Sequence, residues 1–124
     1  MIKVFIVDDH EIIREGLKKI LKEESDFVVV DEAQDGVEAL EKIQHTDCDI
    51  MLLDMNMPGR SGIDLLSDLK IVKPQLHILV LSIHPEDKFA LRTLKAGASG
   101  YLCKDTALDE LVIAIRKIHS KGRY

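Results

Sequence analysis

The sequence predicts an α/β fold built around a parallel sheet, and three features of the 124-residue chain support this prediction. Short runs rich in Val, Ile and Leu are typical of strands buried on both faces, as in parallel sheets. These runs alternate five times with helical patterns, as in a sheet wound with right-handed crossovers. Four of the runs stop at polar residues, namely Asp8-Asp9, Asp54, Ser82 and Lys104. Ligands of such sheets bind beyond the carboxyl ends of the strands, so these residues are expected to converge there.

The predicted strands are short, and a turn or a helical pattern follows each of them. They cover Ile2–Val7, Phe27–Val30, Ile50–Leu53, Leu76–Leu81 and Tyr101–Cys103. A helix from about His10 to Glu24 follows the first strand, because its apolar residues recur on one stripe. That stripe consists of Ile12, Ile13, Leu17, Ile20 and Leu21.

The other helices are predicted from their apolar spacing and from the residues that start or stop them. The second carries Val37, Leu40 and Ile43, and the third extends from about Ile63 to Val72. The fourth begins near Glu86-Asp87, and the last has an inner stripe of Leu108, Leu111, Val112, Ile115 and Ile118. Turn and cap signals separate them, at Asp35-Gly36, Pro58-Gly59, Pro74, Gly97 and Asp105 or Thr106.

Size and composition are those of one globular domain covering residues 1–124. Hydrophobic residues make up 46% and charged residues 31%, and no apolar stretch approaches the roughly 20 residues of a membrane span. Cys48 and Cys103 form no CxxC pair, so we expect reduced thiols in a cytoplasmic protein. The net charge of −5 argues against DNA binding by this domain itself.

The polar residues at the strand ends favour a magnesium site. Two like charges about 4 Å apart repel by roughly 4 kcal/mol at an effective dielectric near 20, so Asp8, Asp9 and Asp54 need compensation. Lys104 is the one cation among the strand-end residues. An all-oxygen cluster favours Mg²⁺ with several waters retained, and no Cys/His pair has zinc spacing. His10, His45, His77 and His119 show no ligand pattern and are interpreted as incidental.

The same residues could perform phosphoryl transfer. Mg²⁺ with Lys104 would neutralise an incoming phosphoryl group, which is most of what such catalysis requires. Asp54 is the expected nucleophile, because it lies on the central run and begins a loop that a ligand can approach. Asp8 and Asp9 suit the metal, and Ser82 can donate a hydrogen bond to a phosphoryl oxygen.

Each residue taken alone also has a structural interpretation. Asp9 could cap the first helix, Asp54 could form an Asx turn, and Lys104 could be a solvated strand end. The joint pattern, in this order along the chain, is specific in a way that its parts are not.

Several motifs together give the chain a resemblance to the receiver domain of bacterial two-component response regulators. They are Val7-Asp8-Asp9-His10, Leu53-Asp54-Met55-Asn56-Met57-Pro58-Gly59, Leu81-Ser82 and Gly97-Ala98-Ser99-Gly100-Tyr101-Leu102-Cys103-Lys104. The resemblance covers the whole chain and implies a flavodoxin-like, CheY-like doubly wound sheet of five parallel strands in order 2-1-3-4-5, with five helices.

The resemblance also implies roles for particular residues. Asp54 would take a phosphoryl group from a sensor histidine kinase, with Mg²⁺ bound by Asp8, Asp9, Asp54 and the backbone carbonyl of Asn56. Ser82 resembles the switch hydroxyl, Lys104 its cationic partner, and Tyr101 the aromatic that turns inward. Asn56 and His84 occupy positions that tune dephosphorylation.

Two further segments, Ala96–Leu102 and Gly122–Tyr124, resemble the NarL/LuxR-type branch. There, a helix-turn-helix DNA-binding domain follows the receiver, so we expect a transcription regulator whose DNA-binding domain is absent from this chain. Phosphorylation is expected to change the surface of the fourth helix, fifth strand and last helix, which could pair with its own copy. The first helix is the expected docking surface for the kinase.

Three other functions would use parts of the same pattern. A stand-alone phosphorelay protein would have the same site without an attached domain. An aspartyl-nucleophile phosphatase would need a general acid, and Asp54 is followed by Met55-Asn56 instead of a D-x-D arrangement. A nucleotide or flavin binder would need a Gly-rich loop after the first strand, where Asp8-Asp9-His10-Glu11 stands.

Overall fold

The computed structural model describes residues 1–57, 62–82, 87–104 and 107–124. Its five strands form one parallel sheet in the order β2-β1-β3-β4-β5. The strands are β1 (Ile2–Val7), β2 (Phe27–Ala33), β3 (Ile50–Asp54), β4 (His77–Ser82) and β5 (Gly100–Cys103). The helices are α1 (Glu11–Lys22), α2 (Gly36–Ile43), α3 (Gly62–Val72), α4 (Asp87–Lys95) and α5 (Ala107–Lys121). The predicted fold class, strand order and helices are confirmed.

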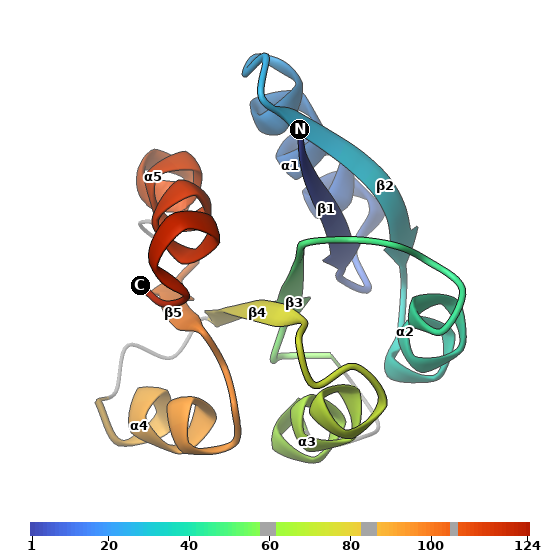
Figure 1. Cartoon of the computed structure of the whole chain (residues 1–124), viewed down its shortest axis with the longest axis vertical. Coiled ribbons are helices and arrows are strands. Elements are labelled where there is room, and N and C mark those ends of the chain that lie inside the picture. The colour runs from blue at the N-terminus through green and yellow to red at the C-terminus, as the bar shows by residue number, and fades with distance from the viewer. Residues whose placement is uncertain (58–61, 83–86, 105–106) are drawn as a thin grey trace.

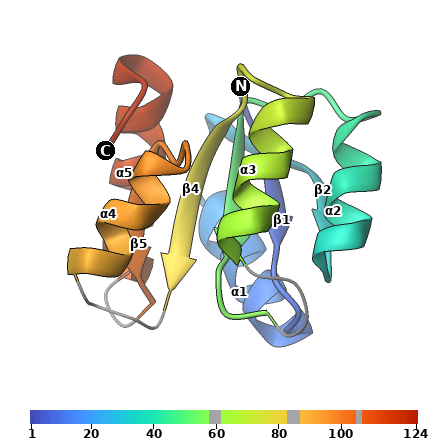
Figure 2. The same cartoon turned by 90° about the horizontal axis from the view of Figure 1, so that it is seen from below.

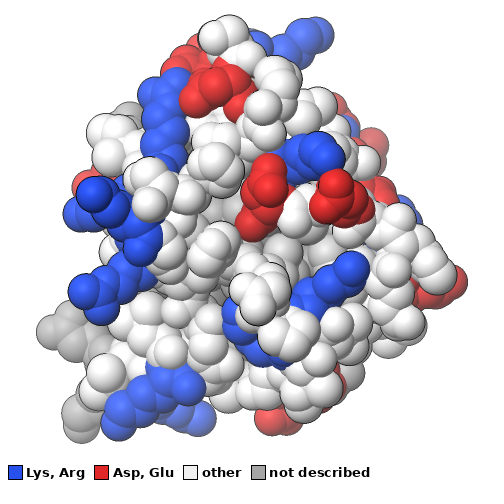
Figure 3. All heavy atoms as spheres, viewed as in Figure 1, with Lys and Arg blue, Asp and Glu red and all other residues white. Residues whose placement is uncertain are grey.

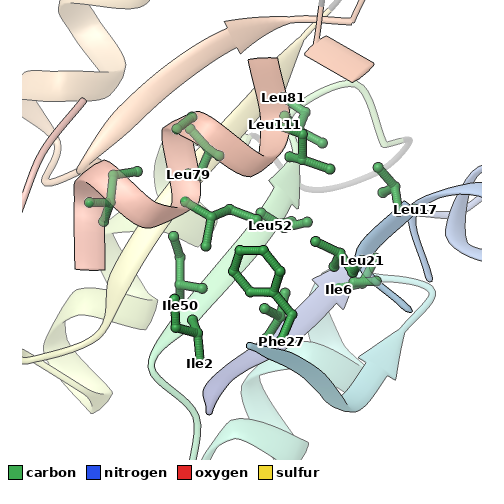
Figure 4. Close-up of a cluster of buried hydrophobic side chains, with 14 of the residues drawn as sticks. Ile2, Ile6, Leu17, Leu21, Phe27, Ile50, Leu52, Leu79, Leu81 and Leu111 are labelled. Carbon is green, nitrogen blue, oxygen red and sulfur yellow. The ribbon is translucent and has the colours of Figure 1, made fainter. Parts of the chain in front are cut away.

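The sheet is covered on both faces, with α1 and α5 on one side and α2, α3 and α4 on the other (Figures 1 and 2). Leu52 of β3 packs beneath α1 and α5 in one cluster of buried side chains (Figure 4). Leu53, the next residue, packs beneath α2 and α3 in the second cluster. Successive side chains of β3 therefore enter two different cores, which explains why its run Ile50–Leu53 is apolar throughout.

The edge strand β2 is longer than predicted, since it continues through Asp31 and Glu32 to Ala33. An edge strand tolerates such polar residues because one of its sides is open. Here Glu32 also accepts from Arg14 Nε at 2.8 Å and from Lys18 Nζ at 2.7 Å.

The first turn of α1 departs from the predicted apolar stripe. Leu17 and Leu21 are buried, but Ile12 is 85% exposed and Ile13 is 40% exposed. Apolar spacing predicts a helix face but does not show which turns of the helix pack against the core. Two large apolar side chains are therefore left on the surface, next to Asp8 and Asp9 in the sequence.

Charge is distributed unevenly over the surface. In the view of Figure 1, Lys and Arg side chains gather on the side formed by α4 and α5 (Figure 3). The exposed cations of these helices include Lys95, Lys117 and Lys121. In the part of the chain that the structure describes, no helix is long and apolar enough to cross a membrane.

Turn signals at Asp35 and Gly97 correspond to helix ends, whereas those at Pro58-Gly59 and Asp105 or Thr106 lie outside the described residues. Asp35 is the N-cap of α2, and its Oδ1 accepts from the Glu38 N–H at 2.8 Å.

Replacing Asp35 by Ala is expected to lower the free energy of unfolding by about 1 kcal/mol, because it removes this cap. Urea unfolding of both proteins would measure the difference, and Asp35→Ser, which can still cap, should restore most of it.

Candidate functional site

Three aspartates meet at the carboxyl edge of the sheet. Asp8 directly follows β1 and Asp54 ends β3, and these strands are neighbours in the sheet through the pair Val7 and Leu53. One side-chain atom from each of Asp8, Asp9, His10 and Asp54 lies within 4.8 Å of the others. Asp8 and Asp54 are each only 1% exposed, so their charges are largely removed from water.

The backbone fixes one oxygen of each buried aspartate. Asp8 Oδ1 accepts from the His10 N–H at 2.9 Å, and Asp54 Oδ1 accepts from the Asn56 N–H at 2.9 Å. Asp54 therefore does form the Asx-type turn that was the structural alternative for it. That turn leaves its second oxygen, Oδ2, buried and without a hydrogen-bond partner among the described residues. The structural and chemical interpretations of Asp54 are thus compatible.

Lys104 extends into the cluster from the end of β5. Its backbone N–H donates to the Ser82 carbonyl at 2.7 Å, which ties it to the end of β4. Its Nζ lies 2.9 Å from Asp54 Oδ1 and 3.5 Å from Asp8 Oδ2. The side chain is 19% exposed, so Lys104 is not a solvated strand end.

Burial raises the pKa of Asp54, and the nearby charge of Asp8 adds to the increase. The Asn56 N–H and Lys104 act in the opposite direction, since both stabilise the ionised carboxylate. The ionised form remains disfavoured despite Lys104. Additional positive charge near the cluster would therefore stabilise the ionised form of Asp54.

The remaining predicted residues lie around this cluster. Ser82, which ends β4, is fully buried, and β4 is the neighbour of β3. Tyr101 is half-buried in β5 and packs against the core beneath α2 and α3. Asn56 is held beside Asp54 by its own N–H. His84 lies outside the described residues.

Sequence reasoning missed the contribution of His10, which it interpreted as incidental. The His10 Nδ1 lies 3.1 Å from Asp8 Oδ1 and 3.0 Å from Asp9 Oδ1. Asp9 does not cap α1, whose N-cap is His10 without a side-chain cap bond. Arg14 Nη1 also reaches the cluster, donating to the Asp8 carbonyl at 2.7 Å. The available signal was position: His10 directly follows the aspartate pair, and Arg14 comes one helical turn later.

The donor set fits a hard divalent cation such as Mg²⁺. Asp54 Oδ2 is a buried side-chain oxygen without a hydrogen-bond partner among the described residues, whereas Asp9 Oδ1 lies 3.0 Å from the His10 Nδ1. Buried polar atoms normally have partners, so a carboxylate oxygen without one, in a cluster whose side-chain atoms lie within 4.8 Å of one another, suits a bound ion. Oxygen donors are those that Mg²⁺ prefers, with water completing its shell.

A five-stranded parallel sheet with aspartates after β1 and β3 and a lysine after β5 defines the class, a CheY-like receiver domain. The chain belongs to the response regulator receiver domain family, whose model matches residues 4–116. Receiver domains of this family are signalling phosphoacceptors that partner with histidine kinases. This assignment favours the receiver interpretation over the phosphatase and the nucleotide or flavin binder.

Relatives in sequence are longer regulators. The chain is 40% identical over 123 residues to the transcriptional regulatory protein DegU of Brevibacillus brevis, covering 99% of this chain and 52% of the relative. It is 37% identical over 124 residues to the response regulator UvrY of Escherichia coli K12, covering 100% and 57%. The chain thus spans about half the length of the curated relatives that it matches.

Solved structures agree in fold. A LuxR-family response regulator from Aurantimonas sp. SI85-9A1 superposes with a TM-score of 0.91 at 36% identity, over 98% of this chain and 86% of that one. The receiver domain of the putative response regulator NarL from Mycobacterium tuberculosis gives 0.88 at 33% identity, over 97% of both chains. The expected NarL/LuxR-type branch is thereby supported.

Proposed function

We propose that Asp54 accepts a phosphoryl group from a phosphohistidine of a sensor histidine kinase. The observation that supports this most is the asymmetry of the Asp54 carboxylate. Its Oδ1 is held by the Asn56 N–H and Lys104, while Oδ2 is buried and has no partner among the described residues. A carboxylate fixed through one oxygen presents the other as an oriented nucleophile.

In the proposed reaction, Asp54 Oδ2 attacks the phosphorus in line, forming an O–P bond as the P–N bond to the kinase imidazole breaks. The electron pair of that bond stays on the imidazole nitrogen. Lys104 forms an ion pair with one phosphoryl oxygen, and the Ser82 hydroxyl donates to another. Hydrolysis of the acyl phosphate by water would return Asp54 to its free form, so the domain catalyses both steps itself.

Asp8, Asp9, Asp54 and the backbone carbonyl of Asn56 would hold Mg²⁺. When bound, the ion supplies positive charge that offsets the carboxylates and the phosphoryl oxygens. The close approach of Asp8, Asp9 and Asp54, with one side-chain atom of each within 4.8 Å of the others, supports this assignment.

Magnesium is expected to stabilise the domain. At ten times its dissociation constant, Mg²⁺ should raise the free energy of unfolding by about 1.4 kcal/mol, through linkage between binding and folding. Denaturant unfolding in EDTA and in Mg²⁺ measures the gain. Asp9→Asn should lose most of it, whereas Glu41→Gln, at an exposed carboxylate of α2, should retain it.

Phosphorylation would then change the surface of α4, β5 and α5. A phosphoryl group adds about 1.5 to 2 negative charges, and Ser82 would move to donate to it while Tyr101 turns inward. The changed surface would pair with a second copy of the chain. Asn56 and His84 would tune how fast the phosphoryl group is lost.

The kinase is proposed to dock on α1. Ile12 and Ile13 are exposed in its first turn, next to the acidic cluster. Exposed apolar side chains beside a reactive site are typical of a protein-binding surface.

The domain, residues 1–124, is proposed to act in the cytoplasm and to control an attached DNA-binding domain. DegU is named a transcriptional regulatory protein, and it is about twice as long as this chain. Cys48 and Cys103 form no disulfide within the described residues, which fits a reducing compartment. Reading the codons after Tyr124 tests this part: a helix-turn-helix domain supports it, and a stop codon favours the stand-alone relay.

The phosphoacceptor proposal is tested with a small acyl phosphate, such as acetyl phosphate, in Mg²⁺ and in EDTA. One phosphoryl group per chain is expected in Mg²⁺, with much less in EDTA. Reduction with borohydride followed by peptide mass spectrometry should locate it at Asp54. Free turnover without a labelled intermediate, or a label elsewhere, would contradict the proposal.

A further inference from the structure

The end of the chain folds back onto the amino-terminal end of β5. Gly122 follows α5 with a φ of +84°, and its N–H donates to the Ile118 carbonyl at 2.7 Å. A glycine in this conformation is a common way to end a helix and reverse the chain. After that turn, the Tyr124 N–H donates to the Ser99 carbonyl at 2.9 Å. The residue after the turn is thus hydrogen-bonded to the residue that precedes β5, beside the C label in Figure 1.

The Tyr124 side chain adds two contacts to this backbone bond. Its hydroxyl donates to Glu110 Oε2 on α5 at 3.1 Å, and Lys117 Nζ lies 5.7 Å from the ring centroid. A Cβ built on Gly100 would lie 3.1 Å from the Tyr124 Cβ. The absence of a side chain at Gly100 therefore lets Tyr124 lie directly against the start of the strand.

Ser99, which accepts the Tyr124 N–H, also forms hydrogen bonds with β4. Its N–H donates to the Ile78 carbonyl at 2.8 Å, while its Oγ accepts from the Ile78 N–H at 3.3 Å. The His77 Nδ1 lies 3.3 Å from the same Oγ. Burial lowers the pKa of His77, and the nearby charges of Lys70 and His119 lower it further. Ser99 therefore links the terminal turn to β4 and to the start of β5.

The other end of β5 enters the carboxylate cluster. Lys104 directly follows the strand, and its Nζ lies 2.9 Å from Asp54 Oδ1. Five residue steps separate Ser99 from Lys104, a span of about 16 Å for an extended strand. Because β5 is an edge strand that pairs only with β4, it can shift along its axis more easily than a central strand.

We infer that Tyr124 is a positioning residue that couples the terminal turn to the Asp54 site through β5. This inference rests on the proposed function and concerns how the Asp54 site is regulated. When Lys104 leaves Asp54 Oδ1 for a phosphoryl oxygen, β5 is drawn toward the carboxyl edge, and the Tyr124–Ser99 contact loosens. The coupling is reciprocal, so a change that loosens the Tyr124–Ser99 contact favours the phosphorylated arrangement by the same factor by which phosphorylation weakens the contact.

Both directions of this coupling can be measured at equilibrium, with beryllofluoride and Mg²⁺ in place of the phosphoryl group. In the unmodified chain, the ligand should speed hydrogen exchange of the Tyr124 amide at least threefold. Reciprocally, Tyr124→Ala should tighten beryllofluoride binding at least threefold. Tyr124→Phe, which keeps the ring against Gly100, should bind nearly as the unmodified chain does. Ile113→Ala, at an exposed side chain of α5, should leave the beryllofluoride affinity unchanged.

The outcomes separate this inference from the proposed function. If acetyl phosphate labels Asp54 but neither the Tyr124 amide nor the affinity responds, the coupling is overturned and the phosphoacceptor role stands. If Asp54 takes no label, both are overturned. Should Tyr124→Ala fail to fold, the amide measurement on the unmodified chain still decides, because it needs no substitution.

Discussion

Replacing Asp54 by Asn is expected to abolish phosphoryl incorporation from acetyl phosphate. An amide has no anionic oxygen, so the buried Oδ2 position can no longer attack phosphorus or carry an acyl phosphate. The substitution keeps an oxygen that can accept the Asn56 N–H, which preserves the turn after β3. Mass spectrometry of the intact protein in Mg²⁺ measures the loss, which should be complete.

Two controls separate loss of chemistry from loss of structure. The pKa of Asp54 is raised in the fold, so its ionised form weakens the fold and stability falls as the pH rises through that pKa. Asp54→Asn removes this effect and should unfold at a temperature no lower than the unmodified chain at neutral pH in EDTA. Asp64→Asn, at an exposed carboxylate of α3, should label normally. A normally labelled Asp54→Asn protein would refute the assignment of the nucleophile.

Replacing Lys104 by Met is expected to slow phosphoryl incorporation by about 10²- to 10³-fold, the usual effect of removing one preorganised charge-stabilising group. Methionine keeps similar length and apolar bulk but removes the cation that lies 2.9 Å from Asp54 Oδ1 and 3.5 Å from Asp8 Oδ2. The initial rate of labelling at fixed acetyl phosphate and saturating Mg²⁺ provides the measurement.

The same variant should bind Mg²⁺ more tightly, because the ammonium group no longer competes for the carboxylates. A collapse of the site would weaken both magnesium binding and labelling, so opposite changes identify an electrostatic role. Lys121→Met, at an exposed position on α5, is the matched control and should change neither. Unchanged labelling in Lys104→Met would remove Lys104 from the proposed mechanism.

Much of the fold was predictable because the central strands β1 and β3 are buried on both faces and consist mostly of apolar residues. The bounds of β1 match the prediction, and β3 and β5 differ from it by one residue. β2 was predicted three residues too short, because Asp31 and Glu32 interrupt its apolar run. These two residues can pair with β1 because β2 is an edge strand and because Arg14 and Lys18 of α1 contact Glu32. Both features depend on tertiary structure.

The convergence of Asp8, Asp9, Asp54 and Lys104 was predictable because parallel strands share one carboxyl edge. Finer features were not. Spacing could not show that Asp54 Oδ1 would be occupied and Oδ2 left without a described partner. Nor could it show that His10 lies between two carboxylates, or that Ile12 and Ile13 remain exposed. These features depend on side-chain directions that only the assembled sheet fixes.

The strand order also bears on how the domain assembles during synthesis. All three aspartates are supplied by β1, β3 and the residues that follow them, whereas Lys104 comes from β5, the last strand and one edge of the sheet. A nascent chain that has formed only β2, β1 and β3 therefore carries the acids without the amine. The negative potential of these acids would attract the incoming lysine. The mutual repulsion of the three aspartates would thus be relieved as β5 docks.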